Sequence, residues 1–275
     1  MRGRFDGKCV LVVGGTSGIG LATVQGFLAE GARVVATGRT ADLDPASRPD
    51  LETSPRLSVL AWDACESAKW AEVFQRAVDW LGNLHVLVHI AGGSGRSWGD
   101  GALHDCPLDA WDKTLHVNLT SVFLSNRSAV RMYLERRQPG VILNVASILP
   151  LAPAPQYFDT CAYTVAKGAV LALTRYGAAR YARQGIRFLA LAPGLVRTPM
   201  AQRALGDAEI MRWLHEKQPL TQGPLSPEQV AHVALFLCSD AASALTGTIV
   251  PVDAGWTLCE GAHTGSLPAQ AGLPE

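Results

Sequence analysis

The chain has 275 residues, of which 48% are hydrophobic and only 17% charged, so it can bury one large core. Its 24 basic residues balance 24 acidic ones, which argues against a surface for nucleic acid or anionic membranes and favours small-molecule partners. Because no apolar run reaches the length of a signal-peptide core or the roughly 20 residues of a membrane span, we expect a soluble, cytoplasmic protein.

Short apolar runs alternate with longer helical patterns along the chain. The expected strands are residues 9–13, 33–37, 57–61, 86–90, 141–145, 187–192 and 248–252. The expected helices are residues 18–30, 67–81, 108–136, 160–183 and 227–239. Continuous apolar strands suit parallel strands that are covered on both faces. The alternation predicts an α/β fold, a doubly wound parallel sheet of about seven strands with helices on both faces.

One domain is expected over residues 1–260, followed by a Gly/Pro/Ala-rich tail at 261–275. Residues 40–55 are rich in Pro, Asp and Ser and predict a surface loop. Residues 92–107 follow the fourth strand, and loops at the carboxyl ends of parallel strands build ligand sites, so this loop is expected to touch substrate.

The six cysteines lie far apart, without a CxxC pair or the His spacing of zinc sites, and predict reduced structural thiols and no metal site. They are Cys9, Cys65, Cys106, Cys161, Cys238 and Cys259.

A glycine-rich turn joins the first strand to the first helix, with the sequence Gly14-Gly15-Thr16-Ser17-Gly18-Ile19-Gly20. Small residues let the backbone approach a pyrophosphate, and the helix N-terminus supplies free N–H groups and a positive dipole end. The strand before and the helix after favour dinucleotide binding over an ordinary tight turn. The spacing is G-x-x-x-G-x-G.

A candidate acid–base pair lies on a later helix, where Tyr163 and Lys167 are four residues apart and share one face. A phenol has a reference pKa near 10, which a neighbouring ammonium would lower. By spacing alone the pair could be an exposed helix couple. Ser147 ends the fifth strand, where its hydroxyl could reach the same pocket. Asn118 lies amid apolar neighbours on a helix and needs a partner or a local backbone kink.

Together these motifs resemble the compact single-domain branch of the short-chain dehydrogenase/reductase family, over roughly residues 7–256, with Val13 in place of the usual Thr of its glycine signature. The resemblance implies a Rossmann-type oxidoreductase that interconverts a carbonyl compound and a secondary alcohol. It further implies that Tyr163 transfers the proton, Ser147 hydrogen-bonds the substrate oxygen, Lys167 binds ribose and lowers the tyrosine pKa, and Asn118 holds a water leading to Lys167.

The resemblance also places the cofactor. Gly38 aligns with the acidic residue that often holds the ribose of NAD, and Arg39 follows it; a guanidinium can pair with a 2′-phosphate, so NADP(H) is favoured and NAD(H) stays possible. Arg39 could instead be solvated or stack on adenine. Asp63 aligns with an adenine-binding Asp, although a helix-capping surface Asp is the alternative. His89, which replaces a family Asn, is expected to be buried and hydrogen-bonded.

The expected cofactor contacts are Gly14, Thr16, Ser17, Gly18, Ile19, Gly20, Arg39, Asp63, Ala64, Ala91, Gly92, Tyr163, Lys167, Pro193, Gly194, Val196 and Thr198.

Three segments are expected to line the substrate pocket: 92–107, 148–162 and 199–222. The second is longer than is usual in the family, and it could also be a packed loop without ligand contact. The candidate substrate contacts are Ser94, Trp98, Ser147, Gln156, Tyr163 and Met200, with Tyr157, Phe158, Trp213 and His215 nearby in sequence. Their composition fits steroid-like, aromatic, acyl or sugar-derived carbonyls alike.

Alternatives to an oxidoreductase are a catalytically silent cofactor-binding scaffold or regulator, and an epimerase or dehydratase, which would need an added substrate domain. The helix that carries Tyr163 is apolar almost all round, which predicts a second subunit against it, as in the family's dimers and tetramers. Cover by the helix at 108–136 is the alternative.

Overall fold

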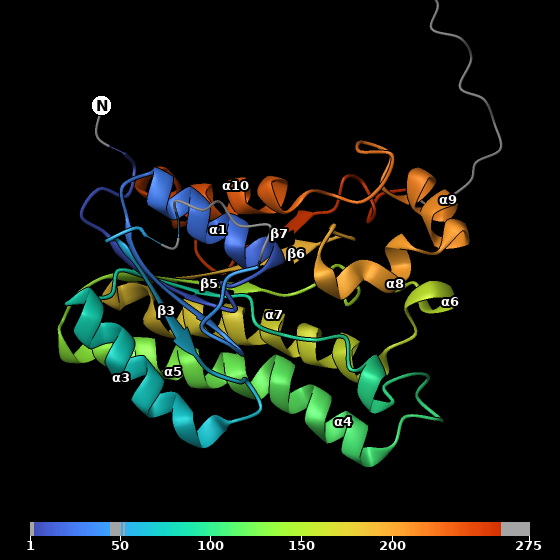
Figure 1. Ribbon diagram of the computed structural model, residues 1–275, viewed down its shortest axis with the longest axis horizontal. Coiled ribbons are helices and arrows are strands. Elements are labelled where there is room, and N and C mark those ends of the chain that lie inside the picture. The colour runs from blue at the N-terminus through green and yellow to red at the C-terminus, as the bar shows by residue number, and fades with distance from the viewer. Residues whose placement is uncertain (1–2, 45–50, 52, 260–275) are drawn as a thin grey trace, which may run out of the picture.

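A computed structural model describes residues 3–44, 51 and 53–259 of the chain, so the predicted tail at 261–275 and part of the predicted loop at 40–55 lie outside the described residues. Seven parallel strands form one sheet in the order β3-β2-β1-β4-β5-β6-β7 (Figure 1). The strands are β1 (Cys9–Val13), β2 (Arg33–Gly38), β3 (Leu57–Ala61), β4 (Val86–His89), β5 (Gly140–Val145), β6 (Ile186–Pro193) and β7 (Ile249–Val252).

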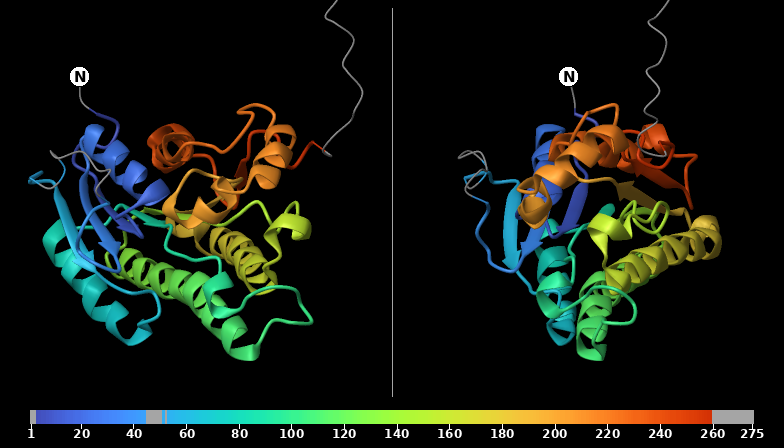
Figure 2. Two further views of the ribbon diagram at one scale, coloured as in Figure 1. Left: turned by 45° about the vertical axis from the view of Figure 1, so that its right-hand side comes forward. Right: turned by 90° about the vertical axis from the view of Figure 1, so that its right-hand side faces the viewer.

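Helices cover both faces of the sheet, α1 and α10 on one face and α3, α5 and α7 on the other (Figures 1 and 2). The α-helices are α1 (Gly18–Ala29), α3 (Trp70–Leu81), α4 (Leu108–Leu115), α5 (Ser121–Glu135), α6 (Pro155–Phe158), α7 (Cys161–Tyr181), α8 (Gln202–Leu205), α9 (Ala208–Lys217) and α10 (Pro227–Cys238). Single tighter or wider turns are η1 (Ser67–Lys69), η2 (Arg96–Trp98), η3 (His116–Thr120), η4 (Ala182–Gln184), η5 (Pro199–Ala201) and η6 (Asp240–Ala242). The predicted doubly wound fold is confirmed.

The sheet is held by two cores, one on each face. All five residues of β1 are buried, and alternate side chains point to opposite faces. Val10 and Val12 pack with the core under α1 and α10, whereas Leu11 and Val13 pack with the core under α3 and α5. Continuous apolar strands are therefore needed because each face is covered, and the two edge strands, β3 and β7, are partly exposed.

The strand order reverses at β1, which pairs with β2 on one side and with β4 on the other. The chain winds outward from β1 to β3 and then crosses to begin again at β4. Such a switch point leaves a crevice outside the carboxyl ends of the two central strands, which is where ligands bind in this class of sheet. The glycine-rich turn after β1 and the loop after β4 both lie there.

The predicted helix at 108–136 is confirmed as one continuous helical segment, which contains a π-helical turn. It begins as α4, passes through the π-helical turn η3 and continues as α5. The turn contains Asn118, whose side chain donates a hydrogen bond to the carbonyl of Thr114 and also reaches outside the helix. A widened turn is a common device where a side chain must leave the helical ladder at a functional position.

Helices α6, α8 and α9 were not predicted from the sequence, and they occupy two of the three segments expected to line a pocket. Figure 1 places them at one end of the molecule, together with the start of α7. No helix among the described residues is long and apolar enough to span a membrane.

Candidate active site

The glycine-rich turn brings two loops into backbone contact. Gly14 has a positive φ of 84°, and a Cβ atom there would lie 2.5 Å from the amide nitrogen of Ala91. Gly18 opens α1 with a φ of 49°, and a Cβ atom there would lie 2.9 Å from a methyl group of Thr198. The turn after β1 therefore needs its glycines to pack against the loops after β4 and β6.

The start of α1 fits an anionic ligand such as a pyrophosphate. Ser17 holds the N-cap position but makes no side-chain capping hydrogen bond, so the first N–H groups of the helix keep their capacity to bind an anion. Gly18, Thr198 and Pro199 line a cavity of about 330 Å³ at this point. Two of the residues expected to contact the cofactor, Gly18 and Thr198, thus line one cavity.

The end of β2 carries no carboxylate. Gly38 is buried, and a side chain there would collide with Thr16. Arg39 follows it, is exposed, and forms no hydrogen bond or ion pair with any described residue. Asp63 accepts a hydrogen bond from the amide of Cys65 at 2.8 Å. This local turn is closer to the helix-capping role, the alternative for this residue, than to adenine binding.

Tyr163 and Lys167 lie in the first two turns of α7, beneath the carboxyl end of β5. The Lys167 side chain is 3% exposed, and its Nζ donates a hydrogen bond to the carbonyl oxygen of Val145 at 2.9 Å. Nζ lies 5.8 Å from the centre of the Tyr163 ring. Burial lowers the pKa of Lys167 to about 8.

Burial raises the pKa of Tyr163 above its ordinary value, and a hydrogen bond with Ser147 opposes that rise. The expected lowering of this pKa invokes Lys167 together with a positively charged nicotinamide; in the protein by itself, desolvation of the phenolate outweighs the other effects and raises the pKa. Ser147 is buried at the end of β5 and also accepts a hydrogen bond from the amide of Leu149. Tyr163 and Ser147 meet as expected.

Asn118 is tied to the loop after β4 rather than pointing into open space. Its Oδ1 accepts from the amide of Gly93 at 3.1 Å, and its Nδ2 donates to the carbonyl of the same residue at 2.8 Å. A Cβ atom on Gly92 would lie 2.6 Å from Asn118 Oδ1 and 3.3 Å from Lys167 Nζ. Gly92 thus lets Asn118 and Lys167 approach the same piece of backbone, and the prediction that Asn118 needs a partner or a kink holds on both counts.

His89 is fully buried at the end of β4. Its Nδ1 and Nε2 lie within hydrogen-bond distance of the hydroxyls of Ser125 (2.7 Å) and Ser121 (3.3 Å). Burial, with a contribution from the charge of Lys167, lowers its pKa to about 3, so it is neutral near neutral pH. The expectation of a buried, hydrogen-bonded histidine is confirmed.

Asp100 fixes the start of the helix that carries Tyr163, and sequence reasoning missed it. It is 4% exposed, and its two carboxylate oxygens accept hydrogen bonds from the amides of Ala162 and Tyr163, each at 2.9 Å. Thr160, at the N-cap, contributes no side-chain bond. Asp100 supplies this cap from 62 positions away in the chain, and no local motif signals such a contact.

An aromatic wall stands beside Tyr163. Trp213 lies 4.9 Å from both Tyr157 and Trp256 between ring centres, and Phe158 contacts both tryptophans. Phe158, Trp213 and Tyr163 pack against the same apolar cluster, to which Trp256 belongs. The segments at 148–162 and 199–222 therefore do meet. No local pattern predicts that Trp256 joins them.

The remaining substrate candidates are less clearly placed. Met200 and Gln156 are exposed, as is His215, and none of them belongs to the apolar cluster beside Tyr163. Trp98 stacks under the ammonium group of Lys113 at 4.8 Å. Ser94 is half-buried in the loop after β4.

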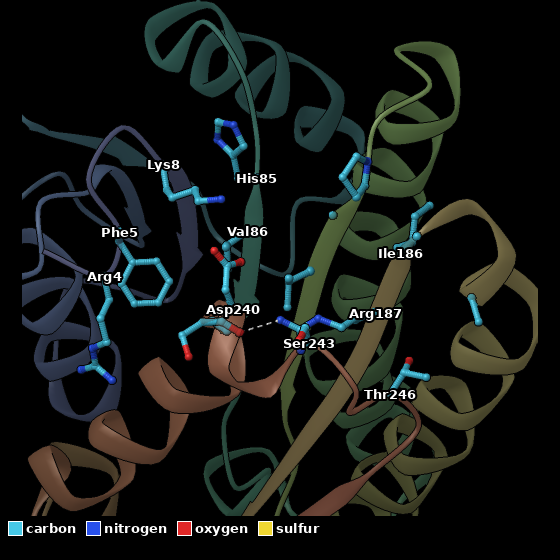
Figure 3. A pocket seen from close by; sticks show the side chains of 17 residues that line it. Arg4, Phe5, Lys8, His85, Val86, Ile186, Arg187, Asp240, Ser243 and Thr246 are labelled. Atoms are coloured by element: carbon cyan, nitrogen blue, oxygen red, sulfur yellow. Dashed lines mark hydrogen bonds between the residues drawn. The ribbon is translucent and has the colours of Figure 1, made fainter. Parts of the chain in front are cut away.

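A second cavity, of about 370 Å³, lies at the opposite edge of the sheet, where β4, β5 and β6 begin (Figure 3). Its most buried charged side chain, Arg187, donates hydrogen bonds to the carbonyls of Leu237, Ser239, Ala242 and Leu245. This arginine closes the end of α10 and η6, and the cavity is remote from the residues described above.

Comparisons with known proteins found relatives that match almost the whole chain. A family model described as enoyl-(acyl carrier protein) reductase matches residues 13–257. A 2-(S)-hydroxypropyl-CoM dehydrogenase from Xanthobacter autotrophicus is 34% identical over 94% of this chain and 99% of its own, and a 3β-hydroxysteroid dehydrogenase from Eggerthella lenta is 33% identical over 95% and 98%. A solved 4-hydroxyisoleucine dehydrogenase mutant, complexed with NADH and succinate, is similar with a TM-score of 0.79, 25% identity and coverage of 91% of this chain and 98% of its own.

Proposed function

Because the chain belongs to the short-chain dehydrogenase/reductase family and is an NAD(P)-dependent enzyme acting on CH–OH or carbonyl groups, we propose that four of its residues catalyse the reaction and that NADP(H) is the preferred cofactor. The four residues are Tyr163, Ser147, Lys167 and Asn118. One observation supports this most directly. A tyrosine hydrogen-bonded to a buried serine lies one helical turn from a buried lysine, beside an apolar wall that can hold the substrate carbon skeleton.

The proton transfer follows from these contacts. The nicotinamide cofactor, when bound, supplies or accepts the hydride. In the reductive direction, Tyr163 gives its proton to the carbonyl oxygen, while Ser147 donates a second hydrogen bond to the oxygen as negative charge develops on it. Because burial raises the pKa of Tyr163, the free enzyme holds this proton at neutral pH and is ready to donate it.

Lys167 and Asn118 support the proton transfer by Tyr163. The lowered pKa of Lys167, about 8, lets it release and regain a proton near neutral pH, which suits a relay that reprotonates Tyr163. Asn118 holds the backbone of Gly93 through two hydrogen bonds, so it fixes the loop against which Lys167 lies. We infer that the π-helical turn η3 serves to aim the Asn118 amide out of its helix.

The test compares Tyr163→Phe with Tyr176→Phe. Tyr176 lies on the same helix and is 63% exposed, so its variant controls for changes in α7. Tyr163→Phe should reduce turnover by a factor of about 10² or more, with cofactor affinity nearly unchanged, whereas Tyr176→Phe should keep turnover. Near-wild-type turnover of Tyr163→Phe would overturn the assignment. A silent scaffold would show no hydride transfer from labelled cofactor in the wild type either.

The proposed preference for NADP(H) rests on Arg39 and on the missing carboxylate at Gly38. A charge-assisted bond from a guanidinium to a 2′-phosphate contributes about 1.5–3 kcal/mol, or roughly 10- to 150-fold in affinity. The similar dehydrogenase solved with NADH shows that the other cofactor also fits this fold. Arg39→Ala should therefore weaken NADPH at least about tenfold and leave NADH unchanged. An equal effect on both cofactors would favour adenine stacking instead.

For the substrate we propose a secondary alcohol or ketone on an apolar carbon skeleton. The relatives are named for a hydroxypropyl thioether and a hydroxysteroid, which share a secondary hydroxyl group but differ in size. The half-buried rings of Phe158 and Trp213 favour the flat, apolar class. A screen of cyclic and linear ketones with NADPH and NADH, followed by cofactor absorbance, tests this. A strict preference for small linear ketones would contradict it.

We further propose that α5 and α7 contribute to a homo-oligomer, a dimer or a tetramer. Internal cover by α4 and η3 accounts for part of the apolar surface of α7, yet Val165 remains 49% exposed, and Phe123 on α5 is 45% exposed. Apolar side chains grouped on adjacent helices suit a subunit interface. A monomeric sedimentation coefficient at micromolar concentration would contradict this proposal.

A further inference from the structure

Three potential metal ligands meet between the loop after β4 and the start of α7. Asp100 and Cys106 lie in that loop, and Cys161 is the first residue of α7. One ligand atom from each lies within 4.8 Å of the other two. Cys106 Sγ donates to Asp100 Oδ1 at 3.8 Å. Asp100 is buried, and the two thiols are half-buried, so a solute can reach them.

These separations suit a small tetrahedral cation. Zinc binds sulfur at about 2.3 Å and carboxylate oxygen at about 2.0–2.2 Å, so a tetrahedral site holds its ligand atoms roughly 3.5–3.8 Å apart. The separation of 3.8 Å between Asp100 Oδ1 and Cys106 Sγ already has that value. The upper limit of 4.8 Å for the cluster leaves at most about 1 Å of movement for Cys161, which side-chain rotation can supply.

We propose that Asp100, Cys106 and Cys161 bind one thiophilic divalent cation of the Zn²⁺ class, with water at the fourth position. Two thiolates and a carboxylate are the ligands that zinc takes in proteins. This assignment departs from the sequence expectation that these cysteines are structural thiols only. The spacing of 55 positions between Cys106 and Cys161 matches no zinc motif, so only the fold brings the ligands together.

The surrounding contacts orient the ligands before any ion binds. Both oxygens of Asp100 are held by the amides of Ala162 and Tyr163, and each oxygen keeps a further lone pair for a cation. The amide of Cys161 donates to the carbonyl of Gly101 at 3.0 Å, which fixes the second segment against the first. Partners of this kind commonly raise metal affinity because they fix the ligand orientation.

The charges also balance. Three anionic ligands and a divalent cation carry a net charge of −1, which the positive N-terminal end of the 21-residue helix α7 stabilises. The guanidinium of Arg96 interacts electrostatically with Asp100 and adds positive charge on the loop side. Because metals bind the thiolate form of cysteine, cation binding releases the thiol protons.

Binding would join the loop after β4 to the helix that carries Tyr163. Without a bound ion, the loop and the helix are connected by hydrogen bonds from α7 amides to the Asp100 carboxylate and the Gly101 carbonyl. Bonds from one ion to both cysteines add a direct link between the two segments. The expected results are a higher unfolding temperature and slower proteolysis within residues 93–107 when the ion is bound.

The experiment uses the full chain, reduced and stripped of metal with a chelator, and titrates it with Zn²⁺ against a chromophoric chelator. We expect one equivalent to bind near neutral pH, with affinity that increases with pH and release of about two protons per ion, one from each thiol. Cys106→Ser and Cys161→Ser should each weaken binding by a factor of about 100 or more, and the exposed Cys65→Ser should leave it unchanged.

A titration of the unmodified chain with Co²⁺ keeps the test valid if a variant fails to fold. Two thiolates bound to tetrahedral Co²⁺ give intense visible bands and a sulfur-to-metal charge-transfer band. The proposal is wrong if no stoichiometric Zn²⁺ binds, if binding survives both substitutions, or if Co²⁺ gives a pale octahedral spectrum. It is equally wrong if the thiols only form a disulfide in air. Because these measurements do not involve turnover, they are independent of the proposed oxidoreductase activity.

Discussion

The buried carboxylate of Asp100 offers a test of how the active helix is held. Asp100→Ala removes an acceptor that binds the amides of Ala162 and Tyr163 at 2.9 Å each, from a side chain that is 4% exposed. Hydrogen bonds to a charged group contribute about 1.5–3 kcal/mol each, and removal of a helix N-cap costs about 1–2 kcal/mol. The two estimates describe overlapping effects, so we expect a loss of about 3 kcal/mol.

That loss is measured by urea unfolding in the presence of a chelator, and it should lower the melting temperature by roughly 5–10 °C. Asp100→Asn keeps one acceptor and should lose about half as much. Turnover should fall more than cofactor affinity, because the helix start places Tyr163 and not the cofactor. Asp105→Asn is the matched control, since its carboxylate is on the same loop and 77% exposed. If Asp100→Ala unfolds within about 0.5 kcal/mol of the wild type, the capping argument fails.

Three further predictions concern residues around the proposed site. Burial lowers the pKa of Lys167 from 10.5 to about 8, so between these pH values the unfolded chain binds one more proton than the folded chain. The contribution of this group to folding stability therefore rises with pH across that window. Lys167→Met should reduce the rise of the urea midpoint with pH. The pKa of His89 is lowered from 6.5 to about 3, so stability is lost as pH falls through that range, and His89→Asn should make the loss shallower in acid titrations followed by circular dichroism. Gly92→Ala would place a methyl group 2.6 Å from Asn118 Oδ1 and should reduce turnover at least about tenfold, whereas unchanged kinetics would show that the contact is unimportant.

Local patterns in the sequence predicted most of the fold. Strands such as β1 are buried on both faces, so their residues must be apolar without interruption, and this signal is visible in five consecutive residues. Asn118 was also informative by itself, because a buried amide demands hydrogen bonds, and the structure supplies them through the π-helical turn and Gly93. Short helices such as α8 lacked enough turns for a periodic signal.

Contacts between distant segments could not be predicted in the same way. Asp100 looks like an ordinary loop residue, and its partners are 62 and 63 positions away. The pKa of Tyr163 was expected to fall through a lysine four residues away and the charge of the nicotinamide. The depth of burial is a property of the packed protein, and in the protein by itself it raises this pKa. The sequence spacing predicted that Tyr163 lies near Lys167. It could not predict how far burial lowers the local dielectric constant, which determines the direction of the pKa shift.

The loop after β4 emerges as the element that connects these observations. Its Gly93 backbone is held by Asn118 from η3, and its Asp100 holds the first amides of α7. The helix with Asn118 and the helix with Tyr163 are therefore both positioned by one connection that carries none of the four proposed catalytic residues. Because the same loop is expected to touch substrate, a substitution that adapts it to a new substrate would also move the acid–base groups. Altered specificity should then be accompanied by altered turnover, unless Gly93 and Asp100 keep their contacts.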